Sequence, residues 1–254
     1  MTNEGRGLID LPGEVELSEA ADYAAAVERD GFAVVADVID AAAVGRLVAE
    51  LDGLAGGVGV SRRSGRAYGV RNLLSVLPSA RGLANGDALR SLITPVLGAG
   101  ARVVRGIFFD KHGGANWKVA WHQDLTVAVC ERAEVEGFGP WSVKAGVPHV
   151  QPPAYVLEGV LALRLHLDDA DEANGALRVV PGSHKHGRLG PRDIERLKAR
   201  RPAVTCAVGR GGAMLMRPLL LHASSASARP SHRRVLHFEY SSSDLPGGLR
   251  WHDA

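Results

Sequence analysis

The pattern of hydrophobic and polar positions changes near residue 102, from helical spacing before it to short apolar runs after it. Residues 18–29 are rich in alanine and predict a helix that Asp30-Gly31 ends. Asp40 is a suitable N-cap for a second helix, because apolar residues from Val44 to Leu51 recur at i, i+3, i+4 and i+7. We also predict a tail at 1–14, a strand at 32–35, a loop at 60–76 and a helix at 86–97.

Beyond residue 102 the chain is dominated by short strands separated by turns. A short charged helix is expected at 192–201, and the long Pro- and Gly-containing segment at 131–154 is expected to be a loop. Strands are predicted at 103–109, 119–129, 161–167, 176–180, 203–208, 213–217, 219–224 and 234–240. Helices followed by about eight strands indicate a mainly β jelly roll of cupin type, with the N-terminal helices packed on one sheet. We expect one domain over residues 1–254.

Composition narrows the class of protein without naming a function. The 254 residues are 46% hydrophobic and carry a formal net charge of only +2, which gives no reason to expect a nucleic-acid partner. Cys130 and Cys206 have no paired spacing, which favours a reducing, cytoplasmic setting over a disulfide framework. We expect no signal peptide and no membrane span, because neither a basic start with an apolar run nor an apolar stretch of spanning length occurs. The sequence indicates no oligomeric state.

A candidate metal site begins at Trp121-His122-Gln123-Asp124. On a strand, side chains at i and i+2 point to the same face, so His122 and Asp124 are expected to present an imidazole nitrogen and a carboxylate oxygen to one point. Two ligands hold a metal poorly, and a third is needed. Two histidines and one carboxylate on one face of an octahedron are typical of non-haem Fe(II) oxygenases.

His222 is the strongest candidate for the third ligand. It follows three leucines on a predicted strand and precedes a run of small residues that leaves room for a ligand. Among the other histidines, His112 and His149 are expected in surface loops, and His166 and His237 in the core. Arg233 opens the last apolar strand, where a buried guanidinium is costly unless it meets an anion such as a carboxylate.

These residues resemble the phytanoyl-CoA dioxygenase family of Fe(II)/2-oxoglutarate oxygenases. The likeness extends over most of the chain and is carried by DGFAVV (30–35), WHQD (121–124), DEANGALRVVPGSH (171–184), LLLHASSAS (219–227) and RRVLHFEY (233–240). It implies a double-stranded β-helix core with His122, Asp124 and His222 as iron ligands. It also implies that Arg233 binds the distal carboxylate of 2-oxoglutarate, with Arg234 as the alternative if the strand register differs by one.

The resemblance implies further contacts and a reaction. Gln123 and Arg164 match positions near the cosubstrate in the family, although Gln123 should point away from the two ligands on an ideal strand. The family reaction uses Fe(II), 2-oxoglutarate and O2, releases succinate and CO2, and oxidises a substrate C–H bond. Because related halogenases have a small residue in place of the carboxylate, Asp124 favours hydroxylation.

Two other classes remain as alternatives: a non-catalytic jelly-roll binding protein and a metal cupin enzyme that does not use 2-oxoglutarate. Arg233 distinguishes them, because neither alternative needs a buried arginine facing a metal. The substrate is expected to be a small molecule, and nothing in the sequence requires a coenzyme A thioester. Segments 55–76 and 131–154 are expected at the mouth of the site, with possible contacts from Arg71, Trp141, Lys144 and His149.

Overall fold

The computed structural model describes residues 20–63, 65–229 and 231–254. The expected tail at 1–14 and the expected first residue of the helix at Ser18 lie outside this part of the chain. Within it, α1 (Ala20–Asp30), β1 (Phe32–Val35) and α2 (Ala41–Asp52) follow the predicted order. The side chain of Asp40 accepts a hydrogen bond of 2.6 Å from the amide of Ala43, as expected of the N-cap of α2.

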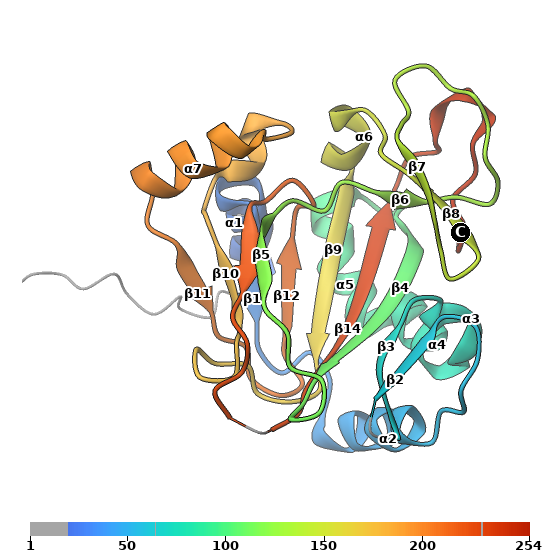
Figure 1. Cartoon of the computed structure of the whole chain (residues 1–254), viewed down its shortest axis with the longest axis vertical. Coiled ribbons are helices and arrows are strands. Elements are labelled where there is room, and N and C mark those ends of the chain that lie inside the picture. The colour runs from blue at the N-terminus through green and yellow to red at the C-terminus, as the bar shows by residue number, and fades with distance from the viewer. Residues whose placement is uncertain (1–19, 64, 230) are drawn as a thin grey trace, which may run out of the picture.

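Most strands belong to two antiparallel sheets (Figure 1). The larger sheet has the order β1-β12-β9-β14-β4-β3-β2 and the smaller sheet β11-β10-β13-β5. Besides β1, the larger sheet contains β2 (Val60–Arg63), β3 (Arg66–Val70), β4 (Arg102–Lys111), β9 (Val160–His166), β12 (Ala213–Met216) and β14 (Arg233–Ser241). The smaller consists of β5 (Val119–His122), β10 (Leu177–Val179), β11 (Val204–Cys206) and β13 (His222–Ser224). This is the double-stranded β-helix, or jelly roll, that the sequence predicted.

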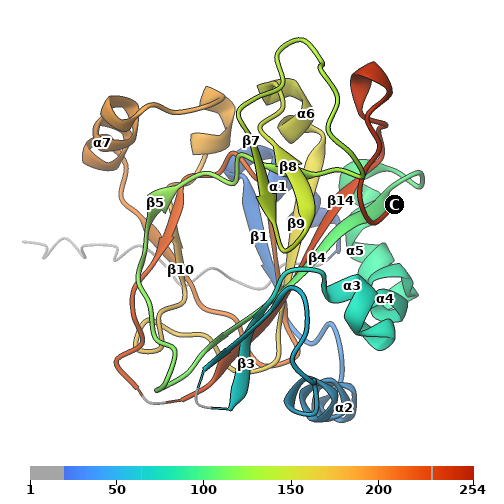
Figure 2. The same cartoon turned by 45° about the vertical axis from the view of Figure 1, so that its right-hand side comes forward.

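Helices cover the outer face of the larger sheet. In Figure 2, β5 and β10 stand apart from β9 and β14, and the helices α3, α4 and α5 lie on the opposite side of the larger sheet. The helices after α2 are α3 (Leu73–Val76), α4 (Pro78–Asn85), α5 (Asp87–Leu97), α6 (Ala154–Glu158) and α7 (Pro191–Arg200). Two short 3-10 turns, η1 (Ser183–His186) and η2 (Pro246–Gly248), complete the helical elements.

Strand alternation divides the larger sheet into an apolar face and a polar face. Leu236, Phe238 and Tyr240 of β14 are buried in the core cluster shared with the helices. Side chains at the odd-numbered positions point to the other side, where Arg233, His237 and Glu239 line a cavity. This face of β14 therefore places Arg233, His237 and Glu239 in the space between the two sheets.

Gly106 lets α3 approach β4 closely. A Cβ atom at this position would lie 2.6 Å from Cγ of Leu74, well inside van der Waals contact. Absence of a side chain at Gly106 therefore permits the packing that supports the centre of β4. The residues on either side of it, Arg105 and Ile107, line the cavity.

Two segments expected to be loops contain hairpins. Within 60–76, β2 pairs with β3, and within 131–154, β7 (Trp141–Lys144) pairs with β8 (Val147–Val150). The second hairpin joins β6 (Val127–Ala128) in a small third sheet. Both loop predictions were therefore wrong, because partly exposed strands with charged residues, glycine or proline lack a clear alternation of apolar and polar positions.

The strand predicted at 119–129 is also interrupted. β5 ends at His122 and β6 begins at Val127, so Asp124 lies just beyond the strand and not on it. The amide of Asp124 donates a hydrogen bond of 2.9 Å to the carbonyl of Pro218, which fixes the backbone as it leaves the sheet. In the described residues, no helix combines the length and the apolar character needed to span a membrane.

Candidate functional site

The register of two short strands brings His122 and His222 together. β5 and β13 are antiparallel, and His222 lies directly opposite His122 in their pairing. The imidazole ring centroids are 4.2 Å apart. The two histidines are one hundred positions apart in the sequence, and the pairing of β5 with β13 in the smaller sheet makes them neighbours in space.

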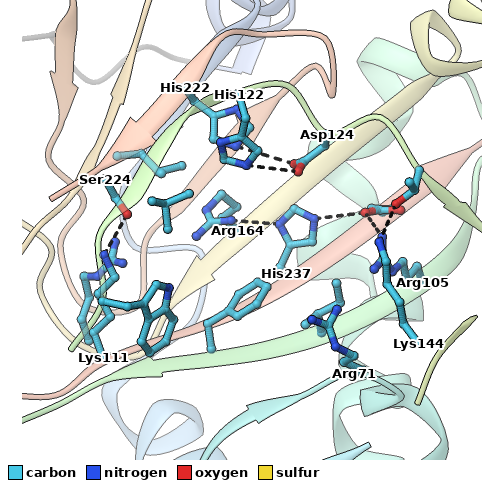
Figure 3. A pocket seen from close by; sticks show the side chains of 18 residues that line it. Arg71, Arg105, Lys111, His122, Asp124, Lys144, Arg164, His222, Ser224 and His237 are labelled. Atoms are coloured by element: carbon cyan, nitrogen blue, oxygen red, sulfur yellow. Dashed lines mark hydrogen bonds and ion pairs between the residues drawn. The ribbon is translucent and has the colours of Figure 1, made fainter. Parts of the chain in front are cut away.

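Asp124 completes a group of three possible metal ligands. One atom from each of His122, Asp124 and His222 lies within 4.8 Å of the others. The carboxylate oxygens of Asp124 are 3.7 Å from Nε2 of His122 and 3.8 Å from Nε2 of His222 (Figure 3). Two imidazole nitrogens and one carboxylate oxygen suit a divalent iron ion and leave other coordination positions open.

The hydrogen bonds of both imidazoles leave the same nitrogen available. Nδ1 of His122 lies 2.9 Å from the carbonyl of Ala120, and Nδ1 of His222 lies 2.8 Å from the carbonyl of Leu220. A carbonyl oxygen only accepts, so each Nδ1 carries the proton and donates it. Each Nε2 therefore keeps a lone pair directed towards Asp124 and available to a metal.

The charge states also suit metal binding. Desolvation raises the pKa of Asp124, but His222, His237, His122 and Arg164 outweigh it and lower that pKa to about 2. Burial lowers the pKa of His222 to about 4, with smaller contributions from His122 and Arg164 in the same direction. At neutral pH the site therefore holds an ionised carboxylate and a neutral imidazole on His222, the forms that bind metals.

Arg233 lies in the same cavity with much of its hydrogen-bonding capacity unused. Its side chain is 4% exposed, and Nε and Nη1 are buried without a hydrogen-bond partner among the described residues. Burial, and to a smaller extent the charge of Arg164, lower the pKa of Arg233 to about 10. An unpaired buried guanidinium is costly, and a carboxylate would match both its charge and its planar donors.

Arg234 has surroundings of a different kind. Its Nε and Nη2 donate to the two carboxylate oxygens of Asp168 at 2.9 and 2.8 Å, and its backbone amide donates to the same carboxylate. Asp52 of α2 lies 3.8 Å from Nη1. Because Arg234 faces the helices and already has a bidentate partner, the geometry favours Arg233 as the arginine available to a ligand in the cavity.

Lys111 and Ser224 line the cavity at the end where Arg233 lies, and neither was predicted as a site residue from the sequence. Lys111 is opposite Arg233 in the pairing of β4 with β14 and is only 1% exposed. Its Nζ donates to Oγ of Ser224 and to the carbonyl of Ser225, both at 2.8 Å. Ser224 could have been predicted, because it lies two residues after His222 on the same strand and therefore points to the same face. The orientation of Lys111 depends on a strand pairing that the sequence does not reveal.

A hydrogen-bonded chain crosses the floor of the cavity (Figure 3). Nη1 of Arg164 donates to Nδ1 of His237 at 3.1 Å, because a guanidinium only donates. Nε2 of His237 therefore carries the ring proton and faces Oε1 of Glu239 at 3.4 Å, and Arg105 donates to the same oxygen at 3.0 Å. Arg164 thus lines the cavity, as expected, and His237 belongs to its polar floor and not to the apolar core.

Gln123 is directed away from the cavity. Its Nε2 donates to the carbonyls of Gly187 and Leu219, and its Oε1 accepts from the amide of Leu189. Three backbone partners occupy both ends of the amide, and the residue does not line the cavity. This placement gives no support to a contact with a cosubstrate and fits a role in holding the surrounding loops.

Residues expected at the mouth divide into two groups. Arg71 and Lys144 line the cavity, whereas Trp141 lies beside the guanidinium of Arg132 and does not. His149 was expected to be a surface group, but it lies on β8 of the hairpin and is only 3% exposed. His112, with the same expectation, is also buried, and its Nδ1 accepts from the amide of Gly114. Both surface assignments were wrong because their segments pair as strands or bridges.

Proteins of known structure share this fold. The crystal structure of AviO1 from Streptomyces viridochromogenes superposes with a TM-score of 0.62 at 25% identity, covering 90% of this chain and 96% of that one. EctD from S. alaskensis, crystallised with 2-oxoglutarate and 5-hydroxyectoine, superposes with a TM-score of 0.66 at 21% identity, covering 93% of this chain and 78% of that one.

Sequence comparison gives a family assignment. An ectoine dioxygenase of Bordetella parapertussis is 27% identical in an alignment 183 residues long, which covers 68% of this chain and 53% of that protein. The chain therefore spans about half the length of the curated relatives it matches. The model of the phytanoyl-CoA dioxygenase (PhyH) family matches residues 27–235, which include all three candidate ligands and Arg233. The chain belongs to the phytanoyl-CoA dioxygenase family.

Proposed function

We propose that this chain is an Fe(II)- and 2-oxoglutarate-dependent dioxygenase that hydroxylates an unactivated C–H bond of a small molecule. The observation that carries the proposal is the buried guanidinium of Arg233, whose Nε and Nη1 lack partners among the described residues. It shares a cavity with the ligand group of His122, Asp124 and His222. Membership of the family supports the same activity.

In this proposal His122, Asp124 and His222 hold the iron through the two Nε2 atoms and a carboxylate oxygen. When bound, Fe(II) with 2-oxoglutarate and O2 supplies an oxidative decarboxylation that yields succinate and CO2 and oxidises the substrate C–H bond. The backbone carbonyls of Ala120 and Leu220 hold the imidazoles in the required tautomer. Asp124 provides the carboxylate that favours hydroxylation over halogenation.

Arg233 binds the distal carboxylate of 2-oxoglutarate and thereby orients the cosubstrate. Ser224 and Lys111 contribute a hydroxyl and a second positive charge at the same end of the cavity. Arg164 adds a buried positive charge on the neighbouring strand β9 and is itself held by His237. Fixing a dicarboxylate at its far end determines where its reactive end lies, which is the purpose of such an anchor.

The walls of the cavity combine apolar and polar surface. Ile107, Phe109 and Leu177 contribute apolar surface between the polar ends, and the cavity has a volume of about 270 Å³. This volume is at the low end for ligand sites, for which roughly 300–1,000 Å³ is usual. The relatives named ectoine dioxygenases also support a small-molecule substrate.

The test is cosubstrate turnover by the purified protein. We expect succinate to form only when Fe(II), 2-oxoglutarate and O2 are all present, and His222→Ala to abolish this turnover. Metal-dependent activity that proceeds without 2-oxoglutarate would indicate a metal cupin enzyme that does not use this cosubstrate. Absence of any turnover, with or without a panel of metabolites, would indicate a binding protein.

A further inference from the structure

We propose that the substrate carries an anionic group, a carboxylate or a phosphate, which Lys144 and Arg71 bind at the end of the cavity remote from Lys111 and Arg233. This inference rests on the proposed function and specifies the substrate class of the same site.

The excess of positive charge in the cavity is the first support for an anionic substrate group. Among the described residues, six cationic side chains line it against two carboxylates, whereas the whole chain has 30 lysines and arginines against 28 acidic residues. Because Fe(II) is itself positive, the two negative charges of 2-oxoglutarate do no more than offset the metal. The cationic residues are Arg71, Arg105, Lys111, Lys144, Arg164 and Arg233, and the carboxylates are Asp124 and Glu239.

The cationic residues form two groups in space. Lys111 lies on one side of His237 with Ser224, and Arg71, Arg105 and Lys144 lie together on the other side (Figure 3). The first group is the one that would receive 2-oxoglutarate. The second group therefore faces the part of the cavity that remains for the substrate.

Within the second group, only Arg105 has an acidic partner among the described residues. Arg105 is 3.0 Å from the carboxylate of Glu239. Lys144 donates to the hydroxyl of Thr126 at 3.1 Å, and no acidic side chain of the described residues lies within ion-pair distance of Lys144 or Arg71. Burial, followed by the charges of Arg105 and Arg71, lowers the pKa of Lys144, although Glu239 and Asp124 act in the opposite direction. A bound anion would relieve this repulsion.

A hydrogen bond from a side chain to the backbone links the segments that carry Lys144 and Arg71. Nδ2 of Asn72 donates to the carbonyl of Ala145 at 3.2 Å, so the residues that follow Arg71 and Lys144 are hydrogen-bonded to each other. Ala145 has a φ of +53°, a left-handed conformation that costs free energy for a residue other than glycine. The turn between β7 and β8 therefore contains a residue in an unfavourable backbone conformation, and the same residue accepts the hydrogen bond from Asn72, next to Arg71.

A neighbouring cavity gives space for the rest of the substrate. It has a volume of about 420 Å³ and shares Arg71, Ile107, Phe109 and Trp117 with the first. Its wall includes the edge-to-face pair of Tyr68 and Trp117, and none of the described residues that line it is acidic. Arg71 lies at the junction of the two cavities, where it can reach an anionic group of a substrate that occupies both.

The experiment uses matched pairs of anionic and neutral probes. The protein is loaded with Fe(II) and saturating 2-oxoglutarate without oxygen, so that the Arg233 end is filled. Butanoate and butanamide, benzoate and benzamide, and phenyl phosphate and phenol are then titrated, with the visible absorption and the thermal midpoint as readouts. We expect anionic members to bind and their neutral partners to bind much more weakly, and the carboxylate and phosphate pairs distinguish the two kinds of group.

Variants assign the effect to the proposed residues. Lys144→Met and Arg71→Met should each weaken binding of the anionic probes about ten- to a hundredfold, as expected for the loss of a charged hydrogen bond. Lys144→Arg should retain binding, and Lys185→Met, at an exposed lysine of η1, should change nothing. Equal binding of anionic and neutral probes, or full affinity in Lys144→Met, would overturn the inference.

The first step of the titration separates this inference from the proposed function. If 2-oxoglutarate itself fails to bind, the proposed function is contradicted. If 2-oxoglutarate binds normally and no anionic probe is preferred over its neutral partner, only the assignment of the substrate class is wrong.

Discussion

Arg233 and Arg234 are adjacent and chemically identical, yet strand alternation gives them opposite surroundings. Arg234 faces the helices and donates to both oxygens of Asp168, whereas Arg233 faces the cavity, and its Nε and Nη1 have no partner among the described residues. The sequence left this choice open, because it depends on which face of β14 meets the core. Residue-level chemistry at this site therefore follows from the fold as much as from residue type.

Replacing each arginine by glutamine should separate the two roles. Arg233→Gln should weaken 2-oxoglutarate binding by about 2–5 kcal/mol, at least about thirtyfold, because a buried charge pair would lose one partner. Arg234→Gln should leave that affinity unchanged and lower the thermal midpoint, since it breaks the contact with Asp168. Calorimetric titration of the anaerobic Fe(II) protein measures the affinity. Normal affinity in Arg233→Gln combined with weak binding in Arg234→Gln would reverse the assignment.

Lys111 should make cosubstrate affinity depend on pH. Burial, together with the charges of Arg233 and Arg164, lowers the pKa of Lys111 from 10.5 to about 7. Above that pH the free protein has lost the ammonium proton, and binding of a dicarboxylate beside Lys111 must take the proton up again. The dissociation constant for 2-oxoglutarate should therefore rise as pH increases above about 7, by up to about tenfold per unit.

Calorimetry between pH 6 and 9 measures this dependence. Lys111→Met should bind more weakly at pH 6 and show a flatter profile, whereas Lys185→Met should retain the profile of the unaltered protein. An unchanged slope in Lys111→Met would exclude Lys111 as the group responsible.

At the scale of elements, apolar runs with clear periodicity were predictable and pairing was not. β1, α2 with its Asp40 cap, and α5 were predicted to within a residue or two. The hairpins β2–β3 and β7–β8 were missed, because exposed strands lack the alternation that one buried face produces. The break between β5 and β6 was also missed, because Gln123-Asp124-Leu125-Thr126 contains no glycine or proline to mark the end of a strand.

The β7–β8 hairpin should make the stability of the protein sensitive to acid. Burial lowers the pKa of His149 from 6.5 to about 4, although its hydrogen bond to Val147 acts in the opposite direction. Between those pH values the unfolded chain binds a proton that the folded chain does not. The free energy of unfolding should therefore fall as pH decreases from 6.5 to 4, by up to about 1.4 kcal/mol per unit from this group.

Denaturant unfolding of the metal-free protein across that range measures the effect. His149→Gln should show a smaller loss of stability on acidification than the unaltered protein. His186→Gln, at an exposed position of η1, controls for removal of a histidine. Equal pH dependence in His149→Gln and the unaltered protein would contradict this origin.

At the scale of the whole molecule, the site is a product of the two sheets together. β5 and β13 of the smaller sheet carry His122, His222 and Ser224, and β4, β9 and β14 of the larger sheet carry Arg105, Lys111, Arg164 and Arg233. The candidate ligands were predictable from residue type and an expected jelly roll. The distribution of charge inside the cavity was not, because it depends on which strands face each other.

Anaerobic titration of the protein with Fe(II) in the presence of 2-oxoglutarate tests the central claim most directly. We expect one Fe(II) per chain in the unaltered protein and in His186→Ala. His122→Ala and His222→Ala, with unchanged circular dichroism, should each lose affinity by more than about a hundredfold, because removal of a direct ligand should exceed the 10–100-fold effects of outer-shell changes. If both variants bind Fe(II) as tightly as the unaltered protein, the assignment of His122, Asp124 and His222 as the metal centre is wrong.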